Sequence, residues 1–412
     1  MPTPADTYRH VRAQTQALAE GLSEGDCQVQ SMPDASPVKW HLAHTTWFFE
    51  TFVLERHAAG FKPFDAAFRV LFNSYYQGVG RQHPRPQRGL ITRPGLSEVL
   101  AYRYAVDEQM RALLTRGIPD AATHVVTLGL HHEQQHQELI LTDLLHLLSC
   151  NPLAPAYRLP PPNLPAAAAA PLAWLHHDGG LVEVGHGGGG FAFDNETPRH
   201  RQWLQPYAIA SRCVTRAEWA AFIADGAYAE PRWWTSAGWD WVNREAIGAP
   251  LHEREAGRAF TLHGLLELPA GTPAAHLSWY EADAFARWWS AQHPSQAPAR
   301  LPTEAEWEHA AEQRPLLDAA QFSDSGVLHA LPTPSLAGSV WQWTASPYTP
   351  YPGFRPWAGA VGEYNAKFMV NQMVLRGGSF ATPREHFRTS YRNFFPTEAR
   401  WQFTGLRLAR DA

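Results

Sequence analysis

The first 150 residues carry apolar side chains at helical spacing. The clearest stretch runs from His131 to Cys150 without Gly or Pro, and its leucines recur every three or four positions. The same kind of pattern predicts helices over about 6–24, 36–59, 64–78, 95–117 and 120–149. Helices of this length, joined by short loops, form a bundle whose interior can hold a metal ion. We therefore predict an all-α, four-helix-bundle domain over residues 1–150.

In the first 150 residues, one predicted helix has a cap in the sequence, and Gly and Pro mark another helix boundary. Ser36 is the expected N-cap of the second predicted helix, with Pro37 in its first turn. Gly117 and Pro119 separate the last two helices. Residues 151–178 are rich in Pro and Ala, which excludes a continuous helix and favours an extended, semi-rigid linker.

From residue 179 onward the pattern is that of a mixed α+β domain, which we predict to span 179–412. Short strand-like pieces alternate with loops rich in Gly, Pro and Trp, namely LVEVGH, FAFDN, HLSWY, MVLRGGSF and GLRLAR. Two amphipathic helices are expected near 215–226 and 280–292, with Thr215 and Ser278 as their N-caps. Asp194, Asn195 and Glu196 offer oxygen ligands for calcium, but a loop held by side-chain hydrogen bonds is the preferred interpretation.

The most compact candidate site is the pair His132 and His136 in the last helix of the bundle. A spacing of four residues puts both imidazoles on one helix face, with their Cβ atoms about 6 Å apart. The neighbouring residues are polar where a plainly buried helix would carry apolar ones. His41 and His44 lie on the second predicted helix, and one of them can complete a three-histidine site. Neutral imidazoles suit Fe, Zn or Cu, so the residues alone leave the metal open.

Composition narrows the class of protein. The 412 residues contain 45% hydrophobic and 18% charged residues, which indicates globular domains with ample cores. A net charge of −5 without a basic block argues against nucleic acid and membrane-surface partners. No apolar run reaches the ~20 residues that a membrane span needs. The N-terminal residues lack a signal pattern and the three cysteines lie far apart, so we expect a cytoplasmic protein without disulfides.

Five phrases of the second half resemble, in order, the sulfatase-modifying (formylglycine-generating) fold, a variant of the C-type lectin fold. They are FDNETPRH, RLPTEAEWEHAA, GSVWQWTAS, RGGSF and GLRLAR. In the first half, HLAHTTWFFE and HEQQHQE resemble the DinB-like helical bundle. A DinB-like bundle joined to a sulfatase-modifying domain is the architecture of the ergothioneine-type sulfoxide synthases, which include the selenoneine synthases as an offshoot.

That resemblance implies an activity and a set of site residues. The activity is the O2-dependent coupling of a thiol to the imidazole carbon of hercynine (trimethylhistidine). The metal would be Fe(II), held by His44, His132 and His136, and Tyr75 or Tyr76 would be the active-site acid. The residues expected to bind the two substrates are Gln135, Asn393, Phe394 and Phe395 for hercynine, and Arg85 and Arg88 for the carboxylate of the sulfur donor.

The identity of the donor remains open between two chemistries. NSYYQGVG, HPRPQRGLITRP and SYRNFFPTEARWQF are most similar to the branch that uses free cysteine. Ser339 and Gln342 in GSVWQWT and Phe380 in RGGSF depart from that branch. Selenoneine synthases, which take selenium from a selenosugar and form a C–Se bond, therefore stay as the alternative.

Other activities fit the residues less well. A formylglycine-generating enzyme needs a late cysteine pair, and this chain has no cysteine after Cys213. A DinB-type thiol S-transferase would use the three histidines, often with zinc, but would not need the second domain. A lectin-like binding module leaves the histidines unexplained. The oligomeric state is left open.

Overall fold

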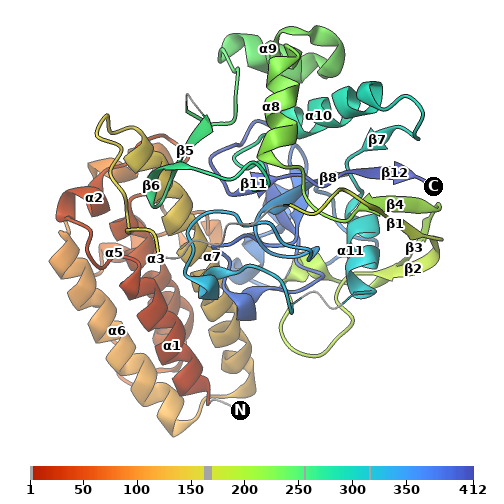
Figure 1. The fold of residues 1–412 in the computed structure, drawn as a ribbon. Helices are drawn as coiled ribbons and strands as arrows, with labels where there is room; N and C mark the ends of the chain where they lie inside the picture. Colours follow the sequence, from red (N-terminus) through yellow and green to blue (C-terminus); the bar gives the residue numbers. More distant parts are fainter. Residues whose placement is uncertain (1–2, 162–168, 255–256, 315–316) are drawn as a thin grey trace. The chain divides into compact units, whose positions relative to one another are not determined.

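The structure is a computed structural model that describes residues 3–161, 169–254, 257–314 and 317–412 (Figure 1). The chain divides into two compact units. The first comprises Met1–Leu153 together with Trp357–Tyr364, and the second comprises Ala154–Pro356 together with Asn365–Ala412. The predicted domain boundaries, 1–150, 151–178 and 179–412, remain a prediction. The predicted fold class is confirmed: the first unit is helical, and the second combines helices with small sheets.

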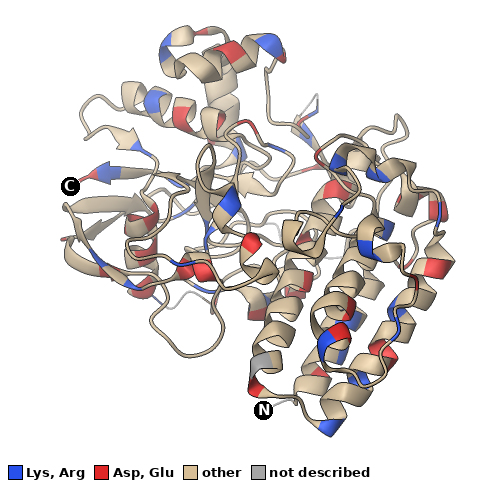
Figure 2. Cartoon of the chain, turned by 180° about the vertical axis from the view of Figure 1, so that it is seen from behind, with Lys and Arg blue, Asp and Glu red and all other residues tan. Residues whose placement is uncertain are grey.

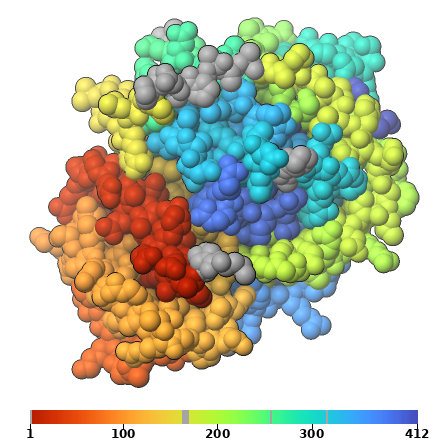
Figure 3. All heavy atoms as spheres, turned by 60° about the horizontal axis from the view of Figure 1, so that its bottom comes forward, coloured from red at the N-terminus to blue at the C-terminus, as the bar shows by residue number. Residues whose placement is uncertain are grey.

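The first unit is built on long helices. Its helical segments are α1 (Pro4–Ala17), α2 (Glu24–Gln28), α3 (Val38–Phe49), the π-helical η1 (Glu50–Leu54), α4 (Glu55–His57), α5 (Phe68–Leu71), η2 (Gln77–Val79), η3 (Arg85–Leu90), α6 (Leu96–Arg116), α7 (Asp120–Ser149) and η9 (Ala360–Glu363). The capping box of Thr3 and Asp6, with Pro4 at the first position, explains why α1 begins where it does. In Figure 3, α1 (red) packs against the orange helices of the same unit.

Three details of the predicted helices were wrong. The helix predicted over 6–24 ends at Ala17. The N-cap of α3 is Pro37, which makes no side-chain cap, while the Ser36 backbone N–H donates to Asp143. The helix predicted over 64–78 shrinks to the single turn α5, because the Asn73 side chain bonds to backbone groups that a helix would need. Its amide donates to the carbonyls of Tyr76, Gly80 and Arg81.

Helices α3 and α7 approach closely enough to bring their histidines together. All twelve residues of α3 are buried. At Gly129 of α7, a Cβ atom would lie 2.6 Å from the Phe49 ring and 2.8 Å from the Phe48 ring. Only glycine leaves room for these two rings, which explains its presence inside a helix despite its low helix propensity.

A buried ion cluster ties α7 to α1 and α6. Glu133, which is fully buried, accepts from Arg12 at 2.9 Å and from Arg103 at 2.5 Å. Burial alone would raise the pKa of Glu133, but the cations of Arg103 and Arg12 outweigh it and lower that pKa to about 2. The carboxylate therefore stays ionised and fixes the turn of α7 that carries His132 and His136.

The second unit contains four small sheets. Their strand orders are β1-β4-β12-β7, β10-β9-β8-β11, β2-β3 and β5-β6. The strands are β1 (Trp174–His177), β2 (Gly180–Val184), β3 (His200–Leu204), β4 (Tyr207–Ala210), β5 (Arg258–Thr261), β6 (Gly264–Glu267), β7 (Ala299–Arg300), β8 (Trp341–Pro347), β9 (Met373–Arg376), β10 (Asn393–Phe395), β11 (Thr404–Gly405) and β12 (Ala409–Asp411). Most pairs are antiparallel, and β11 runs parallel to β8.

Sequence-based strand predictions for this unit were partly right. LVEVGH and MVLRGGSF contain β2 and β9, and GLRLAR begins in β11 and ends in β12. FAFDN forms no strand and runs into the 3-10 turn η4 (Asp194–Glu196), and HLSWY leads into a helix. The last residues of the predicted linker form β1, which pairs with β4. Residues 162–168 of the linker lie outside the described residues.

The helices and 3-10 turns of the second unit fill the space around the sheets. They are η4, α8 (Arg216–Ala224), η5 (Ala227–Ala229), η6 (Pro231–Trp233), α9 (Ser236–Arg244), α10 (Trp279–Gln292), α11 (Glu304–Glu312), η8 (Ser323–Ser325), η10 (Ala366–Phe368) and η11 (Arg384–His386). Thr215 and Ser278 cap α8 and α10 with full capping boxes, as predicted. Helices α9 and α11 were missed, although Thr303 and Glu306 form the same S/T-x-x-E signal at the start of α11.

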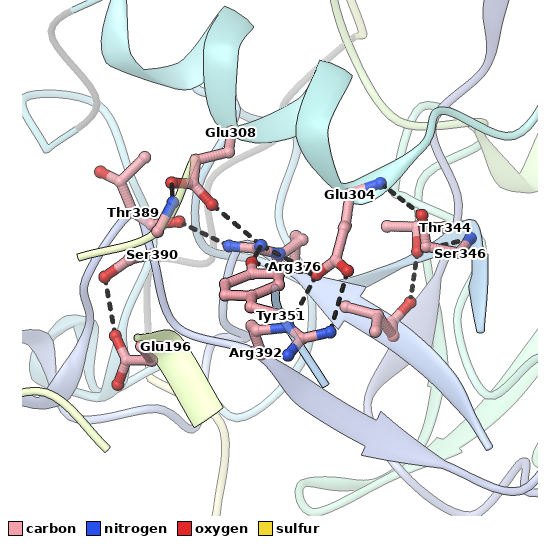
Figure 4. Close-up of polar contacts among 12 residues, drawn as sticks. Glu196, Glu304, Glu308, Thr344, Ser346, Tyr351, Arg376, Thr389, Ser390 and Arg392 are labelled. Carbon is pink, nitrogen blue, oxygen red and sulfur yellow. Dashed lines mark hydrogen bonds and ion pairs between the residues drawn. The ribbon is translucent and has the colours of Figure 1, made fainter. Parts of the chain in front are cut away.

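A buried polar network holds α11 to β9 and β10 (Figure 4). Glu304 accepts from Arg376 at 3.0 Å and from Arg392 at 2.9 Å, and Tyr351 lies against both guanidinium groups. Arg376 also pairs with Glu308 at 2.9 Å. Since charges this deeply buried require partners, the network fixes β10, the strand that carries Asn393.

The η4 turn is also held by side-chain hydrogen bonds, as expected. Asn365 donates to Asp194 at 2.6 Å, and Asn195 donates to the Tyr348 hydroxyl at 2.9 Å. Glu196 accepts from Ser390 and pairs with Arg388. The carboxylates of Asp194 and Glu196, which could bind calcium, are thus used within the protein.

Surface charges are mixed in sign. Figure 2 shows basic and acidic residues interspersed along the helices of the first unit. Within the described residues, no helix combines the length and the hydropathy that a bilayer-spanning segment requires.

Candidate metal centre

Three buried histidines of the first unit converge on one point. His44 comes from α3, and His132 and His136 come from α7. Each offers one ring nitrogen, and these three atoms lie within 4.8 Å of one another. The Nε2 atoms of His132 and His136 are 3.2 Å apart. The structure thus brings together the three residues that the resemblance implies as ligands, and it does not place His41 among them.

One of these histidines, His44, has the tautomer that metal binding requires. The His44 Nδ1–H group donates to the Phe72 carbonyl at 2.6 Å, which leaves Nε2 with its lone pair. Buried His44 Nε2 has no hydrogen-bond partner among the described residues. Because a buried polar atom without a partner is unfavourable, a metal ion at the shared point satisfies an unmet requirement. The donor set of three neutral nitrogens fits Fe(II), Zn(II) or Cu(II).

Burial keeps all three imidazoles neutral. It lowers the pKa of His132 to about 3, even though Glu133 acts in the opposite direction. The pKa values of His44 and His136 are also lowered well below the usual value, first by burial and then by the neighbouring histidines. Neutral imidazole is the form that binds a metal, so the site is ready for one at neutral pH.

Arg88 is a buried cation next to this cluster. Its side chain is 3% exposed, and it donates to the hydroxyls of Ser36 and Ser74. The guanidinium stacks on the Trp40 ring at 3.4 Å, and Trp40 in turn stacks on His44 at 4.5 Å. No carboxylate of the described residues forms an ion pair with Arg88, and its Nε–H has no acceptor there.

The electrostatics of Arg88 follow from this environment. Burial, helped by the nearby cation of Arg85, lowers the pKa of Arg88 well below its usual value. Guanidinium groups nevertheless stay charged in proteins, so Arg88 is a poorly compensated cation that favours an anionic ligand. Arg85, its predicted partner, is exposed and donates to the Asp34 carbonyl.

The two candidate tyrosines occupy different environments. Tyr76 is 2% exposed and packs among Trp47, Phe48 and Phe52. Tyr75 is half-buried, and its ring lies 4.9 Å from Tyr76 and 5.4 Å from Tyr364. Burial, followed by the neighbouring tyrosines, raises the pKa of Tyr75 well above its usual value, so it keeps its proton at neutral pH.

Tyr364 is a site residue that the sequence analysis missed. It belongs to the segment Trp357–Tyr364, which packs with the helical unit although it is more than 200 residues away in sequence. Its hydroxyl donates to Gln135 at 2.8 Å, and its ring lies 5.9 Å from that of His132. Tyr364 lies in the short phrase GEYN, which contains no recognisable motif, so the sequence alone does not identify it.

The remaining predicted residues belong to the second unit. Asn393, Phe394 and Phe395 form β10, which pairs with β9. Phe394 stacks on Tyr348 with ring centroids 4.0 Å apart. Their part in a substrate pocket therefore stays a prediction.

Two family models match this chain, and together they span most of it. Residues 171–327 and 330–412 match the sulfatase-modifying factor enzyme 1-like domain, and residues 7–140 match the DinB superfamily. A hercynine oxygenase of Mycolicibacterium thermoresistibile is 31% identical over 95% of this chain and 91% of its own length. One of Mycobacterium tuberculosis is also 31% identical, over the whole of both chains. The solved structure of PvdO from Pseudomonas aeruginosa has a TM-score of 0.40 and 19% identity, covering 58% of this chain and 94% of that one.

The matches to the two hercynine oxygenases extend over both units. The identity to full-length relatives covers the helical unit with its three histidines as well as the sulfatase-modifying unit. The chain therefore belongs to the ergothioneine-type sulfoxide synthase family.

Proposed function

We propose that this protein is a non-haem Fe(II) enzyme that uses O2 to couple cysteine to the imidazole carbon of hercynine. In balance, one thiol, one ring C–H group and one O2 give a sulfoxide and one water. The observation that carries the proposal is the buried cluster of His44, His132 and His136, in which His44 Nε2 has no hydrogen-bond partner in the described part of the chain. The names of the full-length relatives support hercynine as the acceptor.

The three histidines would hold the metal through neutral nitrogens and leave further positions for substrates. Fe(II), when bound, supplies the redox chemistry that lets O2 react beside the sulfur. The protein's own task is then to keep the ligands neutral, to exclude water and to hold the donor next to the imidazole ring. The burial of the cluster and the stacking of Trp40 on His44 keep the ligands neutral and exclude water.

Arg88 supports cysteine over a selenosugar as the donor. A buried cation without a carboxylate partner favours a ligand that brings its own carboxylate, through a charge-assisted hydrogen bond. Cysteine carries a carboxylate and a selenosugar does not. The selenosugar reaction, which would form a C–Se bond, remains the second candidate because Ser339, Gln342 and Phe380 depart from the cysteine-using branch.

Tyr75 is the proposed proton donor, and Gln135 with Tyr364 is the proposed contact for hercynine. The raised pKa of Tyr75 keeps the phenol protonated, which a general acid requires. The Tyr364 hydroxyl fixes the orientation of the Gln135 amide by donating to its oxygen. Asn393, Phe394 and Phe395 are proposed to bind hercynine, as the family resemblance implies.

The test begins with metal and oxygen. Protein purified without air should take up one Fe(II) per chain and should consume O2 with hercynine and cysteine together, but not with either alone. Replacing His44, His132 or His136 by Ala should abolish iron uptake and turnover, while His146→Ala on the same helix α7 should change neither. Full iron content and activity in His44→Ala would contradict the choice of ligands.

The donor is decided by the same assay. Turnover with cysteine, γ-glutamylcysteine and a selenosugar should be compared at equal hercynine concentration. Preference for cysteine supports the proposal, and strong preference for the selenosugar replaces it by selenoneine synthesis. Thiol transfer without O2 consumption, with zinc as the bound metal, would instead support a DinB-type thiol S-transferase.

A further inference from the structure

His41 lies behind the metal cluster and contacts one of its members. It is 2% exposed, and its Nδ1 is 2.8 Å from Nδ1 of His136. On the other side of the ring, Nε2 is 3.1 Å from Oδ2 of Asp143. Asp143 is itself buried and comes from α7, two turns after His136. The three side chains therefore form a continuous line from a carboxylate to a proposed metal ligand.

Hydrogen-bond chemistry fixes the position of each proton on this line. Oδ2 of Asp143 also accepts the backbone N–H of Ser36 at 2.8 Å, so it faces two donors as an acceptor. The Nε2 atom of His41 must then carry the hydrogen, and Nδ1 of the neutral ring is an acceptor. Because the facing Nδ1 of His136 must in turn be the donor, Nε2 of His136 is left with its lone pair toward His132 and His44.

We infer that His41 is a positioning residue that sets the tautomer and the ring orientation of His136 for metal binding, with Asp143 as its anchor. This inference rests on the proposed metal centre and adds a residue to it. The same task is performed for His44 by the Phe72 carbonyl. Outer partners of this kind orient metal-bound histidines and raise their basicity.

The line continues toward Arg88. Ser36 donates its backbone N–H to Asp143 and accepts from Arg88 Nη1 at 2.8 Å through its hydroxyl. The proposed donor-binding arginine and the metal ligand His136 are thereby joined through Ser36, Asp143 and His41. Ser36 does not cap α3, but it connects Arg88 to Asp143 through these two hydrogen bonds.

Two substitutions at His41 separate positioning from simple packing. His41→Phe keeps a ring of similar size but removes the acceptor for His136, whereas His41→Gln can still accept from His136 and donate to Asp143. Co(II) serves as the probe, because its visible spectrum reports ligand geometry and needs no turnover. The matched control is His146→Phe, the same change on α7, where the imidazole hydrogen-bonds to the Ser31 hydroxyl and to no other described residue.

We expect Co(II) affinity to be highest in the wild type, lower in His41→Gln and lowest in His41→Phe. His41→Phe should weaken Co(II) binding by about 10- to 100-fold and shift the Co(II) absorption bands. In proton NMR of the Co(II) protein, one shifted exchangeable N–H signal, that of His136, should move or disappear in this variant. The corresponding signal of His44 should stay, and the His146→Phe control should match the wild type.

Each result has a definite reading. Co(II) affinity, spectrum and N–H signals unchanged in His41→Phe would overturn the inference while leaving the metal centre in place. If His41→Phe does not fold, His41→Met, which also lacks the acceptor for His136, takes its place: weaker Co(II) binding with shifted absorption bands supports the inference, and wild-type affinity and spectrum refute it. A wild-type protein that binds neither Co(II) nor Fe(II) would refute the proposed function itself, which is a different outcome.

Discussion

At the scale of single residues, Arg88 bears most directly on the sulfur donor. Replacing it by Met keeps the side chain long and removes the charge. If it holds the carboxylate of cysteine, the loss of a charged hydrogen bond, about 1.5–3 kcal/mol, should raise the KM for cysteine by roughly 10- to 150-fold. Steady-state kinetics at saturating hercynine measure this change. Arg85→Met is the control, because Arg85 is exposed and donates to Asp34. Equal effects of both variants would contradict the role given to Arg88.

The two adjacent tyrosines should differ when each is replaced by Phe. Tyr75→Phe removes the proposed proton donor, so formation of the C–S bond should fall by about 10²–10⁴-fold and thiol oxidation to sulfinic acid should rise. Tyr76→Phe changes a ring packed among Trp47, Phe48 and Phe52 and should affect the product ratio little. Product analysis by mass spectrometry distinguishes them. Unchanged product ratios in both variants would remove tyrosine from the mechanism.

His276, in the second unit, should make folding depend on pH. Burial, with Arg400 acting in the same direction, lowers the pKa of His276 to about 3, from about 6.5 in the unfolded chain. The unfolded state then binds the proton first, so this contribution to stability is complete above pH ~6.5 and is lost as pH falls toward the folded pKa.

His276→Asn tests this dependence. Asparagine tolerates the left-handed backbone at this position, where φ is 62°, and it does not titrate. The variant should lose less unfolding free energy than the wild type between pH 6.5 and pH ~4. Urea unfolding at several pH values measures the difference. His10→Asn, on the exposed side of α1, controls for the loss of a histidine, and parallel curves for wild type and His276→Asn would contradict the prediction.

At the scale of elements, the contact between α3 and α7 determines whether the histidines meet. The higher helix propensity of alanine in Gly129→Ala should add about 0.5–1 kcal/mol to the free energy of unfolding. The new methyl group also overpacks the Phe48 and Phe49 rings, which typically lowers that free energy by about 1–3 kcal/mol. We expect a net loss of stability together with weaker Fe(II) binding, because the helices must move apart. Thermal unfolding and metal titration measure the two effects.

The control for this change is another glycine in a helix. Gly25→Ala in α2 places its Cβ no closer than 3.6 Å to a neighbour, the Ser23 hydroxyl, so it should be neutral or stabilising. Unchanged metal affinity in Gly129→Ala would mean that the close approach of the helices is not needed for the site.

At the scale of the whole molecule, the segment Trp357–Tyr364 connects distant parts of the sequence within the helical unit. The Glu363 carboxylate accepts the backbone N–H groups of Gln77 at 2.8 Å and of Gly78 at 2.7 Å. These residues directly follow Tyr75 and Tyr76. The segment therefore holds the tyrosine loop, and it also supplies Tyr364 to Gln135.

Glu363→Ala should release that loop. Hydrogen exchange of the Gln77 and Gly78 amides should become faster, because both lose their acceptor. Glu363→Gln, which keeps one acceptor oxygen, should show an intermediate effect, and amides of α1 should be unchanged in both variants. Equal exchange at Gln77 and Gly78 in all three proteins would show that Glu363 does not hold the loop.

The sequence by itself determined the features that depend on neighbours within a few positions. The helical periodicity predicted α3, α6 and α7, and the N-cap residues Thr215 and Ser278 predicted the starts of α8 and α10. The four-residue spacing of His132 and His136 put both on one face of α7, because helix geometry requires it. Five short phrases were sufficient to identify the second domain, since turns and buried charges constrain the residues that build it.

Only the tertiary structure decided features that depend on which faces meet. His41 and His44 are three residues apart on one helix, and the packing of α3 on α7 turns His44 toward the cluster and His41 toward Asp143. The helix predicted through Asn73 fails because that side chain finds backbone groups in the next loop. Tyr364 joins the helical unit by a long-range contact that no local pattern encodes. Arg85 and Arg88 cannot be distinguished in the sequence. In the structure Arg85 is exposed and solvated, whereas Arg88 is buried and therefore favours an anionic ligand.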